Sequence, residues 1–186
     1  MCKQHVRYWE LASLLSAPKE IEDRCAAIEK LSKDWRAFPT MRFDWRDERV
    51  ICTQEWIADA RSVHRGGDEL DWMLLAEALD AKDCMDLVHG DLCVRNVIWS
   101  EERGSCLAVD WEPDLIQAVG GHRIIKVTKG YTHPNDLHTS RPFSLLSDHY
   151  AFARCLEQVR EVKILSDHVQ PLQGSYADLV RAAFKI

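Results

Sequence analysis

Three short apolar runs in the middle of the chain constrain the fold more than any other feature of the sequence. They are Met85–Val88, Val97–Trp99 and Cys106–Val109, and the polar turn Glu101–Gly104 separates the last two. Runs of this length suit strands, whereas helices usually need at least about 10–12 residues. We therefore expect short strands here. The polar loop between the first two runs should then lie close to the residues that follow the third run, at one edge of the fold that we call the mouth.

The side chains expected at that mouth have complementary chemistry. Asp91 can accept a proton from a hydroxyl nucleophile. Asn96 and Asp110 supply a neutral and an anionic oxygen, which are ligands that a hard cation such as Mg²⁺ prefers. Arg95 is a permanent cation close to where phosphate charge would develop. The alternative for this loop is a solvated turn with a capping aspartate.

The same residues resemble the catalytic core of the protein kinase-like superfamily. The stretch His89-Gly90-Asp91-Leu92-x-x-x-Asn96 is similar to the catalytic loop, and Asp110-Trp111-Glu112 is similar to the metal-binding segment that follows it. Arg95 stands where tyrosine-kinase-like loops carry an arginine. The order of the two motifs and their short separation both fit the family.

This resemblance implies roles for six residues and two ligands. ATP would be the phosphate donor and Mg²⁺ its metal. The implied roles are catalytic base for Asp91, a cation at the transferred phosphate for Arg95, Mg²⁺ ligands for Asn96, Asp110 and Glu112, and a structural brace for His89.

Two later segments extend the resemblance. Thr128–Pro134 is similar to the end of a kinase activation segment, although Asn135 and Asp136 follow where the family has a glutamate. Ser147–Ala153 is similar to the start of the helix that supports the catalytic loop. The resemblance implies that Asp148 binds loop amides, and the alternative is a first-turn aspartate favoured by the helix dipole.

Two weaker matches lie upstream. The stretch Gln54-Glu55-Trp56-Ile57 resembles the hinge between kinase lobes, which implies that backbone groups around Glu55, Trp56 and Ile57 face adenine. Glu29 resembles the structural glutamate of the helix in the small lobe. The alternative for Glu29 is a solvent-facing helical residue.

Hydrophobic periodicity predicts the remaining elements. We expect a loop over 58–68, followed by a helix that begins near Leu70. The expected helices are 7–16, 18–36, 70–81, 146–159 and 176–184, and the expected strand–turn–strand is 41–45 with 49–53.

The family pattern is incomplete at the N-terminal side. No glycine precedes Gly66, so a glycine-rich phosphate loop is not found, and neither Lys3 nor Lys19 fits the lysine of the third strand. If residues 7–36 are helical, the rest of this part holds two strands. We expect an α+β, protein kinase-like fold with a truncated small lobe over 1–57 and a mostly helical large lobe over 58–186, with short strands around the catalytic loop.

The function expected from these motifs is ATP-dependent transfer of phosphate to a hydroxyl acceptor on a protein. One alternative is a pseudokinase that acts as an interaction module, and another is a small-molecule kinase of the aminoglycoside or choline type. Asp91, Asn96 and Asp110 together favour activity, and Gly130-Tyr131 with Pro134 favours the protein-kinase branch. The reduced small lobe leaves room for a partner that completes it.

Composition excludes several other classes. The 186 residues carry a formal net charge of −6 and are 46% hydrophobic, which disfavours both disorder and non-specific nucleic-acid binding. No apolar run is long enough for a membrane span. The seven cysteines are dispersed without a C-x-x-C pair, so we expect reduced thiols and a cytoplasmic location. His133 and His138 lack partners at metal-ligand spacing and are expected to be structural or solvent-facing.

Overall fold

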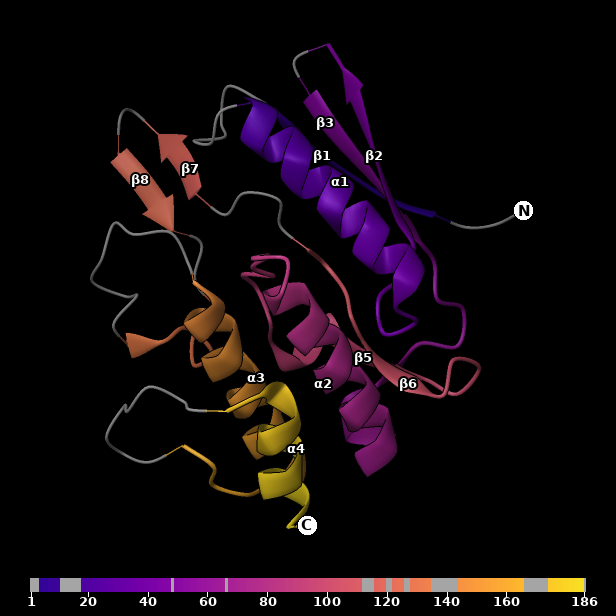
Figure 1. The fold of residues 1–186 in the computed structure, drawn as a ribbon, viewed down its shortest axis with the longest axis vertical. Coiled ribbons are helices and arrows are strands. Elements are labelled where there is room, and N and C mark those ends of the chain that lie inside the picture. Colours follow the sequence, from indigo (N-terminus) through magenta and orange to yellow (C-terminus); the bar gives the residue numbers. More distant parts are fainter. Residues whose placement is uncertain are drawn as a thin grey trace.

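An antiparallel three-stranded sheet with one helix packed on it forms the N-terminal part of the molecule (Figure 1). The computed structural model describes residues 4–10, 18–47, 49–65, 67–111, 116–119, 122–125, 128–134, 144–165 and 174–185. Strands β1 (Gln4–Glu10), β2 (Met41–Arg46) and β3 (Arg49–Glu55) pair in the order β1-β3-β2. Helix α1 (Pro18–Asp34) covers this sheet, and its buried residues Ile21 and Cys25 form a cluster with Val50 of β3.

The prediction of a helix over 7–16 is wrong for the residues that the structure describes. Residues 7–10 belong to β1, which pairs with β3 over seven residues, from Gln4 opposite Glu55 to Glu10 opposite Arg49. Aromatic residues such as Tyr8 and Trp9 suit a strand as well as a helix, and a short apolar run does not separate the two states. This part of the chain therefore has three strands and one described helix, instead of two strands and two helices.

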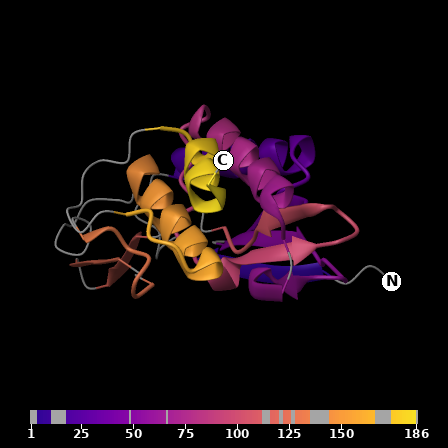
Figure 2. The same cartoon turned by 90° about the horizontal axis from the view of Figure 1, so that it is seen from below.

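The C-terminal part is mainly helical. Helices α2 (Glu69–Asp83), α3 (Leu145–Arg160) and α4 (Tyr176–Phe184) pack together, and Figure 2 shows α4 beside both of the others. A second sheet has the order β4-β5-β6. Its strands are β4 (Arg61–Ser62), β5 (Val97–Ser100) and β6 (Ser105–Ala108). The core between these layers includes fully buried Trp72, Leu75 and Phe152.

Local sequence explains where two of these helices begin. Asp68 caps α2 by accepting a hydrogen bond from Asp71 N, and the Asp71 side chain accepts one from Asp68 N. Ser175 and Asp178 form the same reciprocal pair at the start of α4. The predicted helices over 18–36, 70–81, 146–159 and 176–184 are therefore confirmed within two residues at each end.

Three further differences from the sequence-based prediction concern short segments. Residues 85–88 form a turn and an irregular segment instead of a strand, with Asp86 in the left-handed region at φ 53°. The expected loop over 58–68 contains β4 and a 3₁₀ turn at Val63–Arg65. Strands β7 (Ile116–Val119) and β8 (His122–Ile125) pair as a hairpin that the sequence analysis did not predict.

The two parts of the molecule are joined by direct bonds near the candidate site. Ala108 N at the end of β6 donates to Ala37 O in the segment after α1. Arg103, in the turn between β5 and β6, donates to Arg36 O, to Phe38 O and to Glu55 Oε2. None of the helices that the structure describes is long and apolar enough to cross a membrane.

Candidate active site

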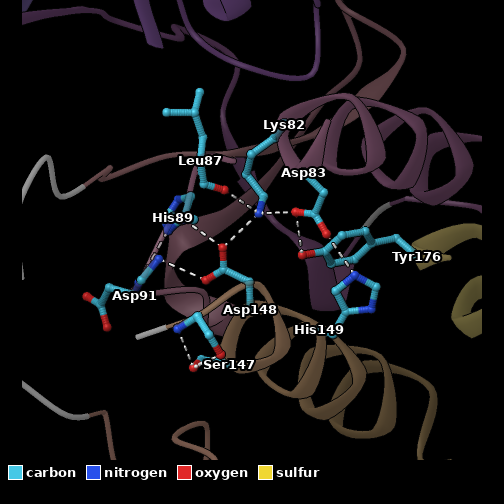
Figure 3. Close-up of polar contacts among 11 residues, drawn as sticks. Lys82, Asp83, Leu87, His89, Asp91, Ser147, Asp148, His149 and Tyr176 are labelled. Carbon is cyan, nitrogen blue, oxygen red and sulfur yellow. Dashed lines mark hydrogen bonds and ion pairs between the residues drawn. The ribbon is translucent and has the colours of Figure 1, made fainter. Parts of the chain in front are cut away.

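Asp148, in the first turn of α3, binds the backbone of the loop that carries Asp91. Asp148 is 1% exposed, and its two oxygens accept hydrogen bonds from His89 N at 2.6 Å and from Gly90 N at 2.8 Å. Figure 3 shows this carboxylate between the loop and α2. Both amides would otherwise be buried without a partner. Asp148 therefore binds the loop backbone, which is the arrangement that the sequence motif suggested.

Lys82, at the end of α2, is a part of this support that the sequence analysis missed. Its ammonium is fully buried and donates to Asp148 Oδ2 at 2.9 Å, to Leu87 O at 2.9 Å and to Asp83 Oδ1 at 2.5 Å. A signal was present, because Lys82 follows the buried Leu79 by three residues and so lies on the apolar face of α2. A lysine on a buried face requires acidic partners.

The charged cluster of Lys82, Asp83 and Asp148 extends to two aromatic side chains. His149 Nε2 lies 2.9 Å from Asp83 Oδ2, and the His149 ring lies 3.9 Å from the ring of Tyr176 (Figure 3). Burial acts to raise the pKa of Asp83, but the hydrogen bonds from His149 and Lys82 outweigh burial and hold this pKa below its usual value. The charged network therefore joins the ends of α2, α3 and α4 underneath the loop.

His89 is buried and connects the two motifs. Its Nε2 lies 3.0 Å from Val109 O, while Asp91 N donates to its Nδ1 at 3.4 Å. This pattern fits the neutral tautomer that carries its proton on Nε2. Burial lowers the pKa of His89, which favours the same uncharged state. His89 thus connects the loop to Val109, and its role as a structural brace stays a prediction.

The carboxylate of Asp91 accepts hydrogen bonds from two neighbouring side chains. Asn96 Nδ2 donates to Asp91 Oδ2 at 3.0 Å and to Asp91 O at 2.8 Å. The hydroxyl of Thr128 donates to the other oxygen, Oδ1, at 2.6 Å. Asp91 is only partly buried. Its carboxylate is therefore oriented by two neutral donors and accepts a hydrogen bond from a hydroxyl group.

Asp110 is brought beside this loop by its preceding residue. Val109 N donates to Asn96 O at 2.9 Å, and Val109 O faces His89. Asp110 has left-handed backbone dihedral angles, with φ 65°, and its side chain is 42% exposed. The backbone of Val109 thus joins the segment that carries Asp110 to the loop that carries Asn96.

A cation from β1 reaches this aspartate. Arg7 Nη1 lies 3.3 Å from Asp110 Oδ1, and its side chain is 24% exposed. The sequence analysis found no counterpart of the family's small-lobe lysine. It missed Arg7 because it expected a helix where β1 lies. Only the pairing of β1 with β3 places this side chain beside Asp110.

The donor set at Asn96 and Asp110 fits a magnesium ion that arrives with phosphates. Asn96 uses its amide nitrogen on Asp91, which leaves its side-chain oxygen for a cation, and Asp110 supplies a carboxylate. Within the described part of the chain, no group of three or more His, Cys, Asp and Glu side chains is arranged to hold a metal alone. Glu112, the third expected ligand, lies outside the described residues, as do Asn135, Asp136 and His138.

The expected hinge residues lie at the end of β3. The Glu55 carboxylate accepts from Arg103 Nη2 at 2.5 Å and from Thr40 N at 3.0 Å. Trp56 is 52% exposed, and Ile57 is buried with its carbonyl accepting from Ala60 N. The Glu55 side chain thus joins the two parts of the molecule, and the expected role of this segment toward adenine stays a prediction.

Glu29 and Arg95 lie in different surroundings. Glu29 Oε1 accepts from Phe43 N at 2.6 Å, so that Glu29 ties α1 to β2. Arg95 is exposed and lines a hollow beside the loop, together with Thr128 and Lys129. His133 is buried against the ring of Tyr150, at a centroid distance of 5.0 Å.

Comparison with known proteins gives a likeness in fold alone. No family model matches the sequence, and no curated protein matches it. The solved kinase PK-1 of Cydia pomonella granulovirus superposes with a TM-score of 0.61 at 13% sequence identity. The match covers 98% of this chain and 78% of the viral chain. The chain therefore has a protein kinase-like fold, and this likeness says nothing about its substrates.

Proposed function

We propose that this chain is an ATP-dependent phosphotransferase that transfers the γ-phosphate to a hydroxyl group on a protein. The observation that carries the proposal is the carboxylate of Asp91, which is held by Asn96 and accepts a hydrogen bond from the Thr128 hydroxyl at 2.6 Å. A carboxylate that is fixed and partly exposed, and that already binds one hydroxyl, suits the role of a base toward an acceptor hydroxyl.

The proposed reaction has a simple balance. The acceptor O–H bond breaks with its proton passing to Asp91, the acceptor oxygen bonds to the γ-phosphorus, and the bond from that phosphorus to the bridging oxygen breaks to release ADP. Asn96 and Asp110 would hold Mg²⁺, which neutralises phosphate charge when bound. Backbone groups from Glu55 to Ile57 would face the adenine.

The test is phosphate transfer by Asp91→Asn. This substitution keeps the shape of the side chain and its bond to Asn96, but it removes the base, so transfer should fall by about 10²–10⁴-fold. The matched control is Asp86→Asn, because Asp86 is exposed, lies five residues away and has left-handed dihedral angles that asparagine tolerates.

The measurement is radiolabel transfer from ATP to a protein mixture and to the chain itself. Equal transfer by wild type and Asp91→Asn would remove Asp91 as the base.

The Arg7–Asp110 ion pair favours the alternative of a pseudokinase, because it occupies one of the oxygens expected to bind metal. That alternative replaces the proposal if wild type transfers no phosphate to any acceptor while it remains folded.

A further inference from the structure

A hollow of about 630 Å³ opens beside Asp91. Its described walls come from four segments that are distant in sequence: Ser62 with the 3₁₀ turn around His64, the segment from Cys93 to Ile98, the stretch from Thr128 to Tyr131, and Gln158 of α3. A volume of this size lies within the range of ligand pockets, which is about 300–1,000 Å³. The hollow is therefore large enough for several side chains of a bound partner.

The position of the hollow relative to Asp91 is fixed by Thr128. The Thr128 hydroxyl bonds to Asp91 Oδ1, and the same residue lines the hollow. Arg95 follows Asp91 by four residues and also lines it. A hydroxyl acceptor bound at Asp91 would therefore extend its neighbouring residues over the hollow.

The charge of the hollow is opposite to that of the chain. Arg95 and Lys129 line it and are exposed, and so is His64, whereas none of the described residues that line it is acidic. In the part of the chain that is described, no carboxylate lies within ion-pair distance of Arg95 or Lys129. The chain as a whole carries a net charge of −6, so this hollow presents two cations in a chain that is acidic overall.

Other described cations near the site are paired with carboxylates. Arg103 binds Glu55, Lys82 binds Asp148, and Arg7 lies beside Asp110. The cations of the hollow thus differ from those that support the fold. Their surroundings include the apolar side chain of Val94 and the ring of Tyr131, which would raise the strength of an ion pair by excluding water.

We propose that this hollow binds acidic residues next to the acceptor hydroxyl of a protein substrate. Arg95 and Lys129 pair with the Asp or Glu carboxylates of that segment, and Val94 and Tyr131 contact their apolar stems. This inference rests on the proposed function and adds the substrate class. It also assigns Arg95 to the acceptor, instead of to the transferred phosphate as the sequence suggested.

The first experiment measures transfer to serine peptides in three matched sets. In one set the three residues on each side of the serine are Asp or Glu, in the second they are Lys or Arg, and in the third they are Ala. Wild type should phosphorylate the acidic set with the lowest KM, and added salt should raise that KM. Equal kcat/KM for the acidic and basic sets would overturn the inference.

The second experiment removes the cations. In Arg95→Gln/Lys129→Gln, KM for the acidic peptides should rise at least about fivefold to tenfold, while KM for the alanine peptides changes less. The charge reversal Arg95→Glu/Lys129→Glu should move the preference toward the basic set. The control is Arg42→Gln, which removes an exposed cation from β2 in the other part of the molecule. An unchanged preference in both double variants would also overturn the inference.

A binding measurement separates this inference from the proposed function. Fluorescence anisotropy of a fluorescein-labelled acidic serine peptide needs no phosphate transfer. Binding that the double variants lose would support the hollow even if wild type transfers no phosphate. Transfer without any charge preference would instead sustain the proposed function and reject the hollow.

Discussion

At the scale of single residues, the buried pair of Lys82 and Asp148 gives the sharpest test of what holds the loop that carries Asp91. Asp148→Ala would remove the acceptor of two backbone amides and one of the three acceptors of the buried Lys82 ammonium. Removing one partner of a buried pair costs about 3–5 kcal/mol. For a chain of this length that corresponds to a melting temperature lower by roughly 6–20 °C, measured by circular dichroism or differential scanning fluorimetry.

The matched control for Asp148→Ala is Asp178→Ala. Both aspartates lie in the first turn of a helix, but Asp178 is exposed and serves only the start of α4. Losing such a cap costs about 1 kcal/mol. If the two variants melt at similar temperatures, Asp148 acts through the helix terminus and not through the loop.

His89 predicts how stability depends on pH. Burial lowers its pKa in the folded chain below the value of about 6.5 that a histidine has when unfolded. The unfolded state therefore binds more protons below that pH, so the free energy of unfolding falls as the pH drops from about 6.5 toward 5, by at most about 1.4 kcal/mol per pH unit. Urea titrations across this range should give a flatter dependence for His89→Gln. An equal slope in both proteins would contradict the assignment.

Which site residues could be predicted follows from whether their role depends on local sequence. Asp91 and Asn96 lie in one motif, and their side chains are in contact as the pattern suggests, whereas a shared site with Asp110 stays a prediction. Arg7 and Lys82 act on partners 103 and 66 residues away. Such pairings depend on strand register and helix packing, which no local pattern gives.

At the scale of elements, Arg103 connects the turn between β5 and β6 to the N-terminal sheet. In Arg103→Met, the two carbonyls after α1 and the Glu55 carboxylate lose a shared donor. The amides of β2 and β3 should then exchange hydrogen faster, by local opening, while those of α2 and α4 stay protected. Hydrogen-exchange mass spectrometry measures both regions in one experiment.

The control for Arg103→Met is Arg61→Met. Arg61 also belongs to the second sheet, but its carboxylate partner is the exposed Glu101 and it does not join the two parts. Faster exchange of β2 and β3 in both variants would show that the effect is a general loss of stability and not a loss of the connection.

Elements differ in how far their sequences determine them. Helix α4 was predicted correctly because Ser175 marks its start and the apolar spacing continues to Phe184. Strand β1 was wrongly predicted as part of a helix, because the strand is stabilised by pairing with the distant β3. The turn at residues 84–86 replaced a predicted strand because an apolar run at Met85–Val88 can be buried without ladder partners.

At the scale of the whole molecule, nucleotide binding should stabilise the chain through Asp110. ATP at about 100 times its Kd would contribute about 2.7 kcal/mol. That corresponds to a rise in melting temperature of roughly 5–10 °C for a chain of this length. In Asp110→Asn the part of this rise that requires Mg²⁺ should vanish, as measured by thermal shift with and without the metal.

Asp47→Asn provides the control for Asp110→Asn. Asp47 also has left-handed dihedral angles, with φ 52°, and lies exposed in the turn between β2 and β3. The same substitution there changes charge and backbone preference in the same way. A Mg²⁺-dependent rise that persists in Asp110→Asn, or that also vanishes in Asp47→Asn, would reject the metal assignment.

The sequence predicted the kind of fold but not the full composition of its smaller part. An α+β kinase-like arrangement followed from the loop motifs and the helical spacing of the C-terminal half, and the structural likeness at 13% identity agrees with it. The expected division between residues 57 and 58 stays a prediction. The count of strands before it was wrong, because it depended on the helix that β1 replaced.

The left-handed backbone of Asp110 costs stability at a residue whose carboxylate the proposed activity requires. Glycine would adopt a φ of 65° without the steric cost that a Cβ brings, so a sequence selected only to fold well would have little reason to keep a charged side chain there. The aspartate instead leaves a carboxylate that is 42% exposed and lies 3.3 Å from Arg7 Nη1. A stabilised version of this protein, obtained by optimising melting temperature alone, would therefore be expected to lose this residue early and its proposed activity with it.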